Sequence, residues 1–328
     1  MALGRASTQP KLSTASRWPR VALFVLAALL ACSSVVVVAV LYVELRLTAP
    51  AYALVGQAPP DLHAETVFIP SASGAILHGW FMVGRPGGGA IVLMHGIGSN
   101  RLSMVRRARL LNENGFSVLL FDFQAHGESS GTRITLGQSE ALDARSAVEF
   151  VRRRLPDERI GAIGASLGGA AALLGPGPLP VEALVIEAVY PDINAALANR
   201  FRIVLGPTIG RASAPLLVPL FELLAPSIGV RPDRLRPLNH IGEVTVPLLV
   251  ASGTRDTRTT IAETRELFAR AREPKSLWMV EGADHVDLEA FAPAEYRRRV
   301  LPFLEQLRRA DDRHADPSSR PVLSQPAR

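Results

Sequence analysis

The sequence contains a single cysteine, Cys32, and only two lysines, Lys11 and Lys275, among its 328 residues. One cysteine excludes an intrachain disulfide and does not identify the redox compartment. Because lysine is so scarce, the formal net charge of +6 comes almost entirely from arginine, which is spread along the chain. No basic patch interleaved with aromatic residues accompanies these arginines, so we expect no nucleic-acid partner.

Sequence motifs for metal and nucleotide binding are also missing. The chain has no H-E-x-x-H segment, no cluster of Cys and His, no G-x-x-x-x-G-K-[ST] and no G-x-G-x-x-G. Its one dense glycine run, GRPGGG at residues 84–89, is typical of a turn between strands. We therefore expect neither a metal ion nor a cofactor.

Residues 21–43, VALFVLAALLACSSVVVVAVLYV, form a run of 23 residues without a charged side chain. A helix of this length reaches roughly 34 Å, at about 1.5 Å per residue, and can cross the hydrocarbon core of a bilayer. We predict one N-terminal transmembrane helix here, with the lipid bilayer as its partner. Two processed forms remain as alternatives: a cleaved signal peptide, and a lipoprotein cut within LLAC at 29–32 and lipidated on Cys32.

Basic residues flank this run unequally. Cytoplasmic flanks of membrane helices carry the excess of positive charge. Residues 1–20 are therefore expected to be a cytoplasmic segment, and everything after residue 43 is expected to lie outside the cytoplasm, in a single-pass protein of the cell membrane. The basic residues concerned are Arg5, Lys11, Arg17 and Arg20 before the run, and Arg46 soon after it.

The remaining chain divides into a linker at 44–60, a folded domain at 61–308 and a disordered tail at 309–328. Within the domain, short apolar runs alternate with helical patterns, which predicts an α/β fold with a mostly parallel sheet of eight strands and helices on both faces. The first two strands precede any helix and are expected to form an antiparallel edge. The predicted strands are 66–69, 76–83, 90–94, 117–121, 160–163, 183–186, 248–251 and 276–280, and the clearest helices are 139–155 and 261–271.

Ser166 lies in a segment made almost entirely of Gly, Ala and aliphatic residues, RIGAIGASLGGAAAL at 159–173. An apolar strand pattern precedes it and an Ala-rich helical pattern follows, so the serine lies at a strand-to-helix corner. Gly164 and Gly168 lie two residues before and after it, where a sharp corner leaves no room for a Cβ. This spacing is that of the nucleophile elbow, G-x-S-x-G. A glycine-softened turn with an incidental serine is the alternative for the motif by itself.

A serine nucleophile needs a base that is itself oriented by a carboxylate. His285, in EGADH, follows the last predicted strand, and Asp256, in LLVASGTRD, follows the strand before it. Both therefore lie at carboxyl ends of strands, where open α/β sheets carry their chemistry. The set Ser166, Asp256 and His285 is our candidate for the catalytic residues.

Residues 62–308 resemble the α/β-hydrolase superfamily, especially its prolyl-oligopeptidase-like and small serine-esterase branches. The resemblance rests on ILHGWFM, VLMHGIGSNR, LLFDFQAHGESSG, IGASLGG, PLLVASGTRD and EGADH. It implies a Ser-Asp-His triad in the chain order seen here, and an oxyanion hole formed by the backbone N–H groups of Ile97 and Leu167.

The resemblance also assigns some residues to other roles. Gln124-Ala125 replaces the usual Arg-Gly before the second HG, which loosens the assignment to a branch and leaves the triad untouched. His95 and His126 belong to backbone-turn motifs in this family, so we interpret them as structural. Glu187, at the end of a predicted strand, is the alternative position for the acid.

Residues 193–242 are too long for a simple crossover, and they fall where α/β-hydrolases insert lids. We expect a compact, mostly helical cap over Ser166, whose apolar stretch APLLVPLFELLAPSIGV makes the pocket entrance apolar. That these side chains only fill the cap's own core is the alternative.

The expected function is that of a membrane-anchored serine hydrolase that cleaves a carboxylic ester through an acyl-enzyme, with a small-molecule or lipid-like acyl substrate. Thioester or peptide hydrolysis and acyl transfer are alternatives on the same triad. A non-catalytic binding domain that keeps the fold is the alternative from a different class.

Overall fold

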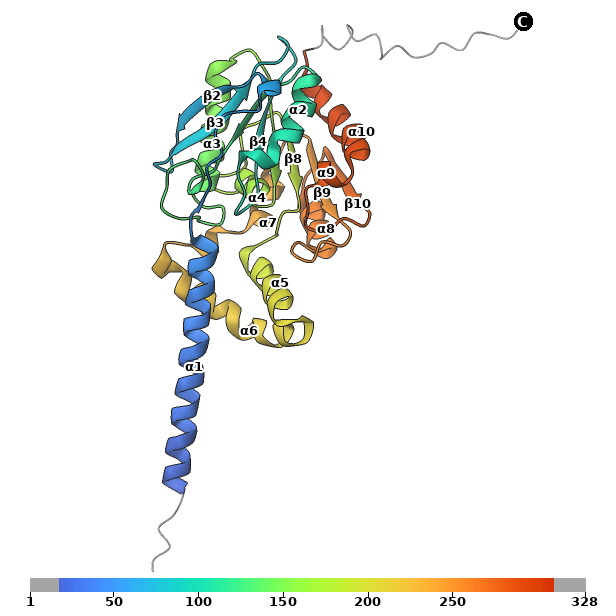
Figure 1. Ribbon diagram of the computed structural model, residues 1–328. Helices are drawn as coiled ribbons and strands as arrows, with labels where there is room; N and C mark the ends of the chain where they lie inside the picture. The colour runs from blue at the N-terminus through green and yellow to red at the C-terminus, as the bar shows by residue number, and fades with distance from the viewer. Residues whose placement is uncertain (1–17, 310–328) are drawn as a thin grey trace, which may run out of the picture.

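The computed structural model describes residues 18–309, apart from several side chains of the first helix and that of residue 228. The predicted cytoplasmic segment, 1–20, and the predicted tail, 309–328, therefore lie almost entirely outside the described residues. Figure 1 shows a layered domain from which one long helix projects.

An eight-stranded sheet forms the centre of the domain, in the order β10-β9-β8-β7-β4-β5-β3-β2. All neighbouring pairs are parallel except β2 with β3 and β3 with β5, so the predicted antiparallel edge is present. Each predicted strand appears, with its ends within two residues of the expected positions. The strands are β2 (Glu65–Pro70), β3 (Ile76–Met82), β4 (Ala90–Met94), β5 (Ser117–Phe121), β7 (Ile160–Ala165), β8 (Ala183–Glu187), β9 (Leu248–Gly253) and β10 (Lys275–Val280).

Helices cover both faces of this sheet, because its central strands are apolar on both sides and must be buried twice. One apolar core includes side chains of α2 (Val105–Glu113), α9 (Leu288–Phe291) and α10 (Pro293–Leu304). The other includes side chains of α3 (Glu140–Arg154), α4 (Leu167–Leu173) and α8 (Ile261–Arg270). The short helix α7 (Pro237–His240) precedes β9.

The first helix, α1 (Trp18–Thr48), is 31 residues long and continues past the uncharged run. The carbonyl of Thr48 accepts a hydrogen bond of 2.9 Å from the Ile134 amide. The chain then forms β1 (Ala51–Tyr52), which pairs in parallel with β6 (His126–Gly127). The expectation of a linker over 44–60 therefore needs correction, since its first half is helix and strand bonded to the domain.

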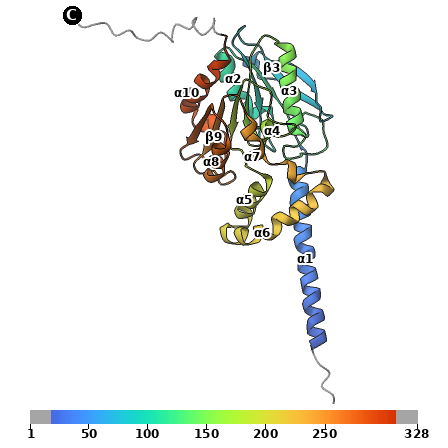
Figure 2. The same ribbon diagram turned by 180° about the vertical axis from the view of Figure 1, so that it is seen from behind.

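The predicted cap contains α5 (Ile193–Leu205) and α6 (Pro207–Leu224), followed by short helical turns. Both helices lie at the end of the domain from which α1 projects, and α6 crosses α1 (Figures 1 and 2). Only Gly210 and Phe221 of α6 are buried. The helix is therefore mostly exposed and is not the compact cap that the sequence predicts.

Large apolar side chains remain exposed on this cap, among them Val204 on α5 and Ile209, Leu216 and Leu223 on α6. Apart from α1, part of which is undescribed, one stretch of the described chain, Pro207–Ser227, is long and apolar enough to cross a membrane by length and composition. The alternative that the cap's apolar residues only fill its own core does not account for these exposed side chains.

A buried ion pair ties the carboxyl end of β8 to helices on one face of the sheet. Arg107 of α2 donates to Glu187, at the end of β8, over 2.6 Å, and Tyr296 of α10 donates to the same carboxylate over 2.6 Å. All three side chains are almost fully buried. A buried pair contributes little relative to an apolar replacement, but removing one partner leaves an uncompensated charge.

Arg107→Met should therefore lower the free energy of unfolding by about 3–5 kcal/mol, because Glu187 then stays buried without its cation. The double variant Arg107→Met/Glu187→Met should regain most of that loss. Denaturant unfolding measures both, with Arg152→Met, in an exposed pair with Glu182, as a control expected to change by less than about 1 kcal/mol. A single variant as stable as the control would contradict the prediction.

Candidate active site

The turn between β7 and α4 holds Ser166 in a strained conformation, with φ 51° and ψ −109°. Its backbone amide donates a 2.7 Å hydrogen bond to the carbonyl of Glu187 on the next strand. A Cβ on Gly164 would lie 2.5 Å from the backbone of Gly168, and a Cβ on Gly168 would lie 2.4 Å from the carbonyl oxygen of Met94. The two glycines are thus required by close backbone contact, as the sequence predicts. Strain of this kind concentrates at functional sites.

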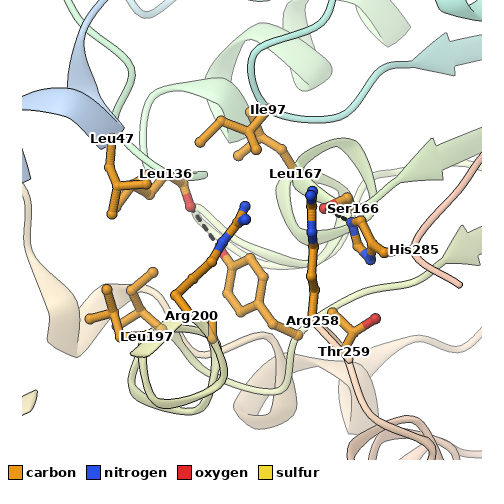
Figure 3. A pocket seen from close by; sticks show the side chains of 13 residues that line it. Leu47, Ile97, Leu136, Ser166, Leu167, Leu197, Arg200, Arg258, Thr259 and His285 are labelled. Atoms are coloured by element: carbon orange, nitrogen blue, oxygen red, sulfur yellow. Dashed lines mark hydrogen bonds between the residues drawn. The ribbon is translucent and has the colours of Figure 1, made fainter. Parts of the chain in front are cut away.

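The structure brings Ser166, His285 and Asp256 into one hydrogen-bonded chain. Nε2 of His285 lies 3.2 Å from Oγ of Ser166, and Nδ1 lies 2.8 Å from Oδ2 of Asp256. The three residues follow β7, β10 and β9, which end at the same edge of the parallel sheet. Dashed lines and labels in Figure 3 show the serine and histidine facing the same pocket.

Asp256 is held as a carboxylate by its surroundings. Burial would raise the pKa of this carboxyl, but the hydrogen bond and charge of His285 and the hydrogen bonds from Thr259 outweigh it and lower the pKa below its usual value. The amides of Arg258 and Thr259 donate to Oδ1, which leaves Oδ2 for His285 and the Thr259 hydroxyl. These fixed donors orient the carboxylate toward the imidazole.

The backbone amides of Ile97 and Leu167 both belong to residues that line the pocket beside Ser166. Leu167 is the first residue of α4, and first-turn amides have no partner within their own helix. Ile97 lies in the loop after β4, between Gly96, whose added Cβ would sit 3.6 Å from the Ser166 Cβ, and Gly98, at φ +69°. In the described chain, neither amide donates a hydrogen bond.

Two histidines, His95 and His126, brace the loop that carries Ile97. Nε2 of His95 accepts from the Phe123 amide over 3.1 Å, and Nε2 of His126 accepts from the Gly98 amide over 3.1 Å. Their Nδ1 atoms donate to backbone carbonyls. Burial lowers the pKa of His95 to about 3 and also lowers that of His126. Neutral rings with both nitrogens engaged fit the structural role inferred from the sequence.

Glu187, the alternative acid, lines a hollow near Ser166, but its carboxylate has other partners. Its carboxylate accepts from Arg107 and Tyr296, whereas the carboxylate that accepts the hydrogen bond from Nδ1 of His285 is that of Asp256. The geometry therefore favours Asp256 as the partner of the imidazole.

An apolar pocket opens beside Ser166 (Figure 3). Leu136 forms part of its wall, and α5 contributes side chains from one face. Leu47, near the end of α1, completes the wall. Part of the pocket wall thus comes from α1, whose residues the sequence predicts to be a transmembrane helix at 21–43 and a linker from residue 44 onward. The apolar lining residues from α5 are Ile193, Ala196 and Leu197.

This lining corrects the expectation that the stretch APLLVPLFELLAPSIGV would form the pocket entrance. None of the residues of α6 lines the pocket; α5 does. Hydropathy alone could not separate the two helices, because both are apolar and only the packing decides which faces Ser166. Two further lining residues, Arg200 and Arg258, carried no motif that would have singled them out.

Among the described residues, no group of three or more His, Cys, Asp or Glu side chains is placed to hold a metal ion. A second hollow meets the apolar pocket at Ser166 and His285 and is more polar, with Ser99 and Ser103 in its wall. Ser166 is therefore accessible from two sides, one suited to an acyl chain and one to a more polar group.

Residues 91–299 match the alpha/beta hydrolase family. The chain belongs to that family. An esterase of Pyrococcus furiosus superposes with a TM-score of 0.65 at 26% identity, over 80% of this chain and 99% of the esterase. This α/β-hydrolase is therefore a hydrolase with esterase-like relatives.

Two curated relatives extend the comparison. The protein YfhR of Salmonella typhi is 29% identical over 257 residues, which cover 75% of this chain and 83% of YfhR. A thiohydrolase of Aspergillus aculeatus is 30% identical over 189 residues, which cover 52% of this chain and 58% of that enzyme.

Asp256→Asn should lower turnover of a short acyl ester by about 10⁴-fold, because an amide can hold the imidazole in the wrong tautomer. Glu187→Gln should cost stability through its lost pairing with Arg107, while its kcat per folded molecule should fall far less. Steady-state kinetics normalised to the folded fraction separates a loss of kcat from a loss of stability in each variant. A larger loss of kcat in Glu187→Gln than in Asp256→Asn would transfer the role of the acid to Glu187.

Proposed function

We propose that this α/β-hydrolase is a membrane-anchored serine hydrolase that cleaves carboxylic esters through an acyl-enzyme. The observation that supports this proposal best is the hydrogen-bonded chain from Asp256 through His285 to Ser166, which ends at the strained corner between β7 and α4. The esterase of Pyrococcus furiosus, with its similar fold, supports an ester as the substrate class.

In this mechanism the Ser166 hydroxyl attacks the acyl carbonyl while Nε2 of His285 takes its proton. Asp256, kept ionised by its low pKa, accepts from Nδ1–H and stabilises the imidazolium that forms. His285 then returns the proton to the departing alcohol, which leaves the acyl group on Ser166. Water, deprotonated by the same imidazole, releases the acid and restores the serine.

The carbonyl oxygen of the acyl group becomes negatively charged both when Ser166 attacks it and when water attacks the acyl-enzyme. The amides of Ile97 and Leu167 stand beside Ser166 and donate to no group in the described chain. Preorganised donors of this kind stabilise an oxyanion, and losing one costs about 2.7–4 kcal/mol in the best-measured case. The bracing of the Ile97 loop by His95 and His126 keeps its amide in place.

Thioesters are a second substrate class for the same residues. The thiohydrolase of Aspergillus aculeatus is 30% identical to this chain over 189 residues, and its name supports this alternative. The acyl half of a thioester and of an ester is the same, so the apolar pocket accommodates both. Parallel assays with an acyl thioester and the matching oxygen ester rank the two.

Labelling with a fluorophosphonate tests the proposed nucleophile. The wild type should be labelled, whereas Ser166→Ala should not, and His285→Ala should react more slowly by at least about 10³-fold, because these residues act as a unit. Ester turnover should fall in parallel, with circular dichroism unchanged. Ser213→Ala, in α6 and away from the pocket, is the matched control.

An unlabelled wild-type protein that is folded and hydrolyses no ester would reject the serine mechanism and favour a non-catalytic binding domain. Labelling at a serine other than Ser166 would show that the other serine is the nucleophile.

The proposal includes the bilayer as a partner of α1. The uncharged run 21–43 lies within this helix, which projects from the domain at the end where α5 and α6 lie (Figure 2). Both of these helices carry exposed apolar side chains. An amphipathic helix with such side chains can rest at the membrane interface. In this arrangement the pocket that Leu47 lines opens close to the lipid surface.

The excess of basic residues before the run orients α1 with the N-terminus in the cytoplasm. Alkaline phosphatase fused after Arg328 should therefore be active, while green fluorescent protein fused at the same position should be dark when exported through the Sec pathway. The protein should remain with the membrane after a carbonate wash. Fluorescence with no phosphatase activity would reverse the proposed topology.

A further inference from the structure

Two arginine side chains extend into the apolar pocket next to the candidate nucleophile. Arg200, on α5, and Arg258, in the loop after β9, line the same pocket as Ser166 and His285. Figure 3 shows both guanidinium groups directed into the space between Leu136 and Ser166. No carboxylate is among the residues that line this pocket.

Two guanidinium groups side by side are electrostatically unfavourable unless an anion compensates them. Burial, followed by the positive charge of Arg258, lowers the pKa of Arg200. No ion pair of either guanidinium is present in the described chain. Arg200 is half-buried and loses part of its hydration, whereas Arg258 is exposed. The two like charges repel each other, and no protein carboxylate in the described chain pairs with either of them.

Nearby acidic groups are already committed to other donors. Asp256 accepts from His285 and Thr259, and Glu263 accepts from the Asn199 amide over 2.8 Å and from the backbone amide of Thr260 over 2.7 Å. Glu187 and Asp287, which line the polar hollow together with Arg258, both pair with Arg107. A carboxylate or phosphate brought by a substrate would therefore be the first unpaired anion available to the two guanidinium groups.

A hydrogen bond between a side chain and the backbone also fixes the positions of the two arginines relative to one another. Asn199, which is 1% exposed, donates to the carbonyl of Arg258 over 3.0 Å and so ties α5 to the loop after β9. The amide of Arg258 donates in turn to Asp256 over 2.8 Å. Arg200 adjoins Asn199 in sequence, so the same contact positions both arginines relative to the catalytic candidates.

We propose that Arg200 and Arg258 bind an anionic group of the acyl substrate, a carboxylate or a phosphate, close to the bond that Ser166 attacks. Guanidinium groups match the planar fork of these oxyanions and form charge-assisted hydrogen bonds with them. The inference rests on the proposed hydrolase function and narrows its substrate class from any ester to an amphiphilic, anionic one.

The positions of the arginines allow the charge on either side of the ester bond. Arg200 lies three and four residues beyond Leu197 and Ala196 on the face of α5 that lines the pocket, so an acyl chain along these residues would end at its guanidinium. Arg258 borders both the apolar pocket and the polar hollow, so it also reaches a charged leaving group.

Two pairs of substrates test the inference in the full-length protein. The first places the charge on the acyl side, with the p-nitrophenyl monoester of hexanedioic acid compared with p-nitrophenyl hexanoate. The second places it on the alcohol side, with 1-dodecanoylglycerol 3-phosphate compared with 1-dodecanoylglycerol. Wild-type kcat/KM should favour the anionic member at least tenfold in one pair, and the preferred pair identifies which side carries the charge.

Arginine variants should then lose this preference. Arg200→Gln and Arg258→Gln should each reduce the ratio of anionic to neutral kcat/KM at least tenfold, and Arg200→Lys should keep part of it because the charge remains. Arg202→Gln, an exposed arginine on the same helix that lines neither pocket, should leave the ratio unchanged. A wild-type ratio near one in both pairs, or equal ratios in wild type and both Gln variants, would overturn the inference.

A binding measurement separates this inference from the proposed catalysis. In Ser166→Ala, decyl phosphate or decanoate should raise the melting temperature more than decanol does, and the added Arg200→Gln change should remove the difference. If this holds while fluorophosphonate labelling and ester turnover are absent in the wild type, the anion site stands and the hydrolase proposal fails. Equal shifts with all three probes would reject the anion site, whatever the activity.

Discussion

Close backbone contact at the corner between β7 and α4 is the constraint on which the rest of the site depends. Gly164 and Gly168 approach one another and Met94 so closely that no side chain fits, and the chain can turn there only with Ser166 at a positive φ. This strain presents the hydroxyl at the sheet edge and leaves the Leu167 amide at the start of a helix. The parallel order of β7, β9 and β10 then brings His285 and Asp256 to the same edge.

Segments that are far apart in the sequence line the pocket beside this corner. Leu47, at the end of the helix proposed to enter the bilayer, lines the pocket beside Ser166, and α5 forms another part of its wall. The contact between Asn199 and the loop of Arg258 couples that wall to the acid's own loop. The proposed anchoring, acyl binding and anion site would therefore share one small region at the end of the domain from which α1 projects.

Much of the fold was accessible from the sequence, for identifiable reasons. Strands such as 90–94 and 117–121 are short runs that are apolar except for Ser117 at the start of the second. Their predicted ends match the structure because burial on both sheet faces favours apolar side chains at nearly every position. The end of α1 was misjudged because Glu44 and Arg46 end the uncharged run, whereas the helix continues to Thr48, where a hydrogen bond to the domain holds it.

The sequence by itself determined the strand order along the chain, the Ser166 corner and the identity of His285 and Asp256 as its candidates, because spacing around glycines and strand ends is a local property. Only the tertiary structure decided that α5 rather than α6 faces the pocket, that Glu187 pairs with Arg107, and that Arg200 meets Arg258. These are contacts between segments tens of residues apart, and no local pattern records which face of an apolar helix is covered or which charge finds a partner.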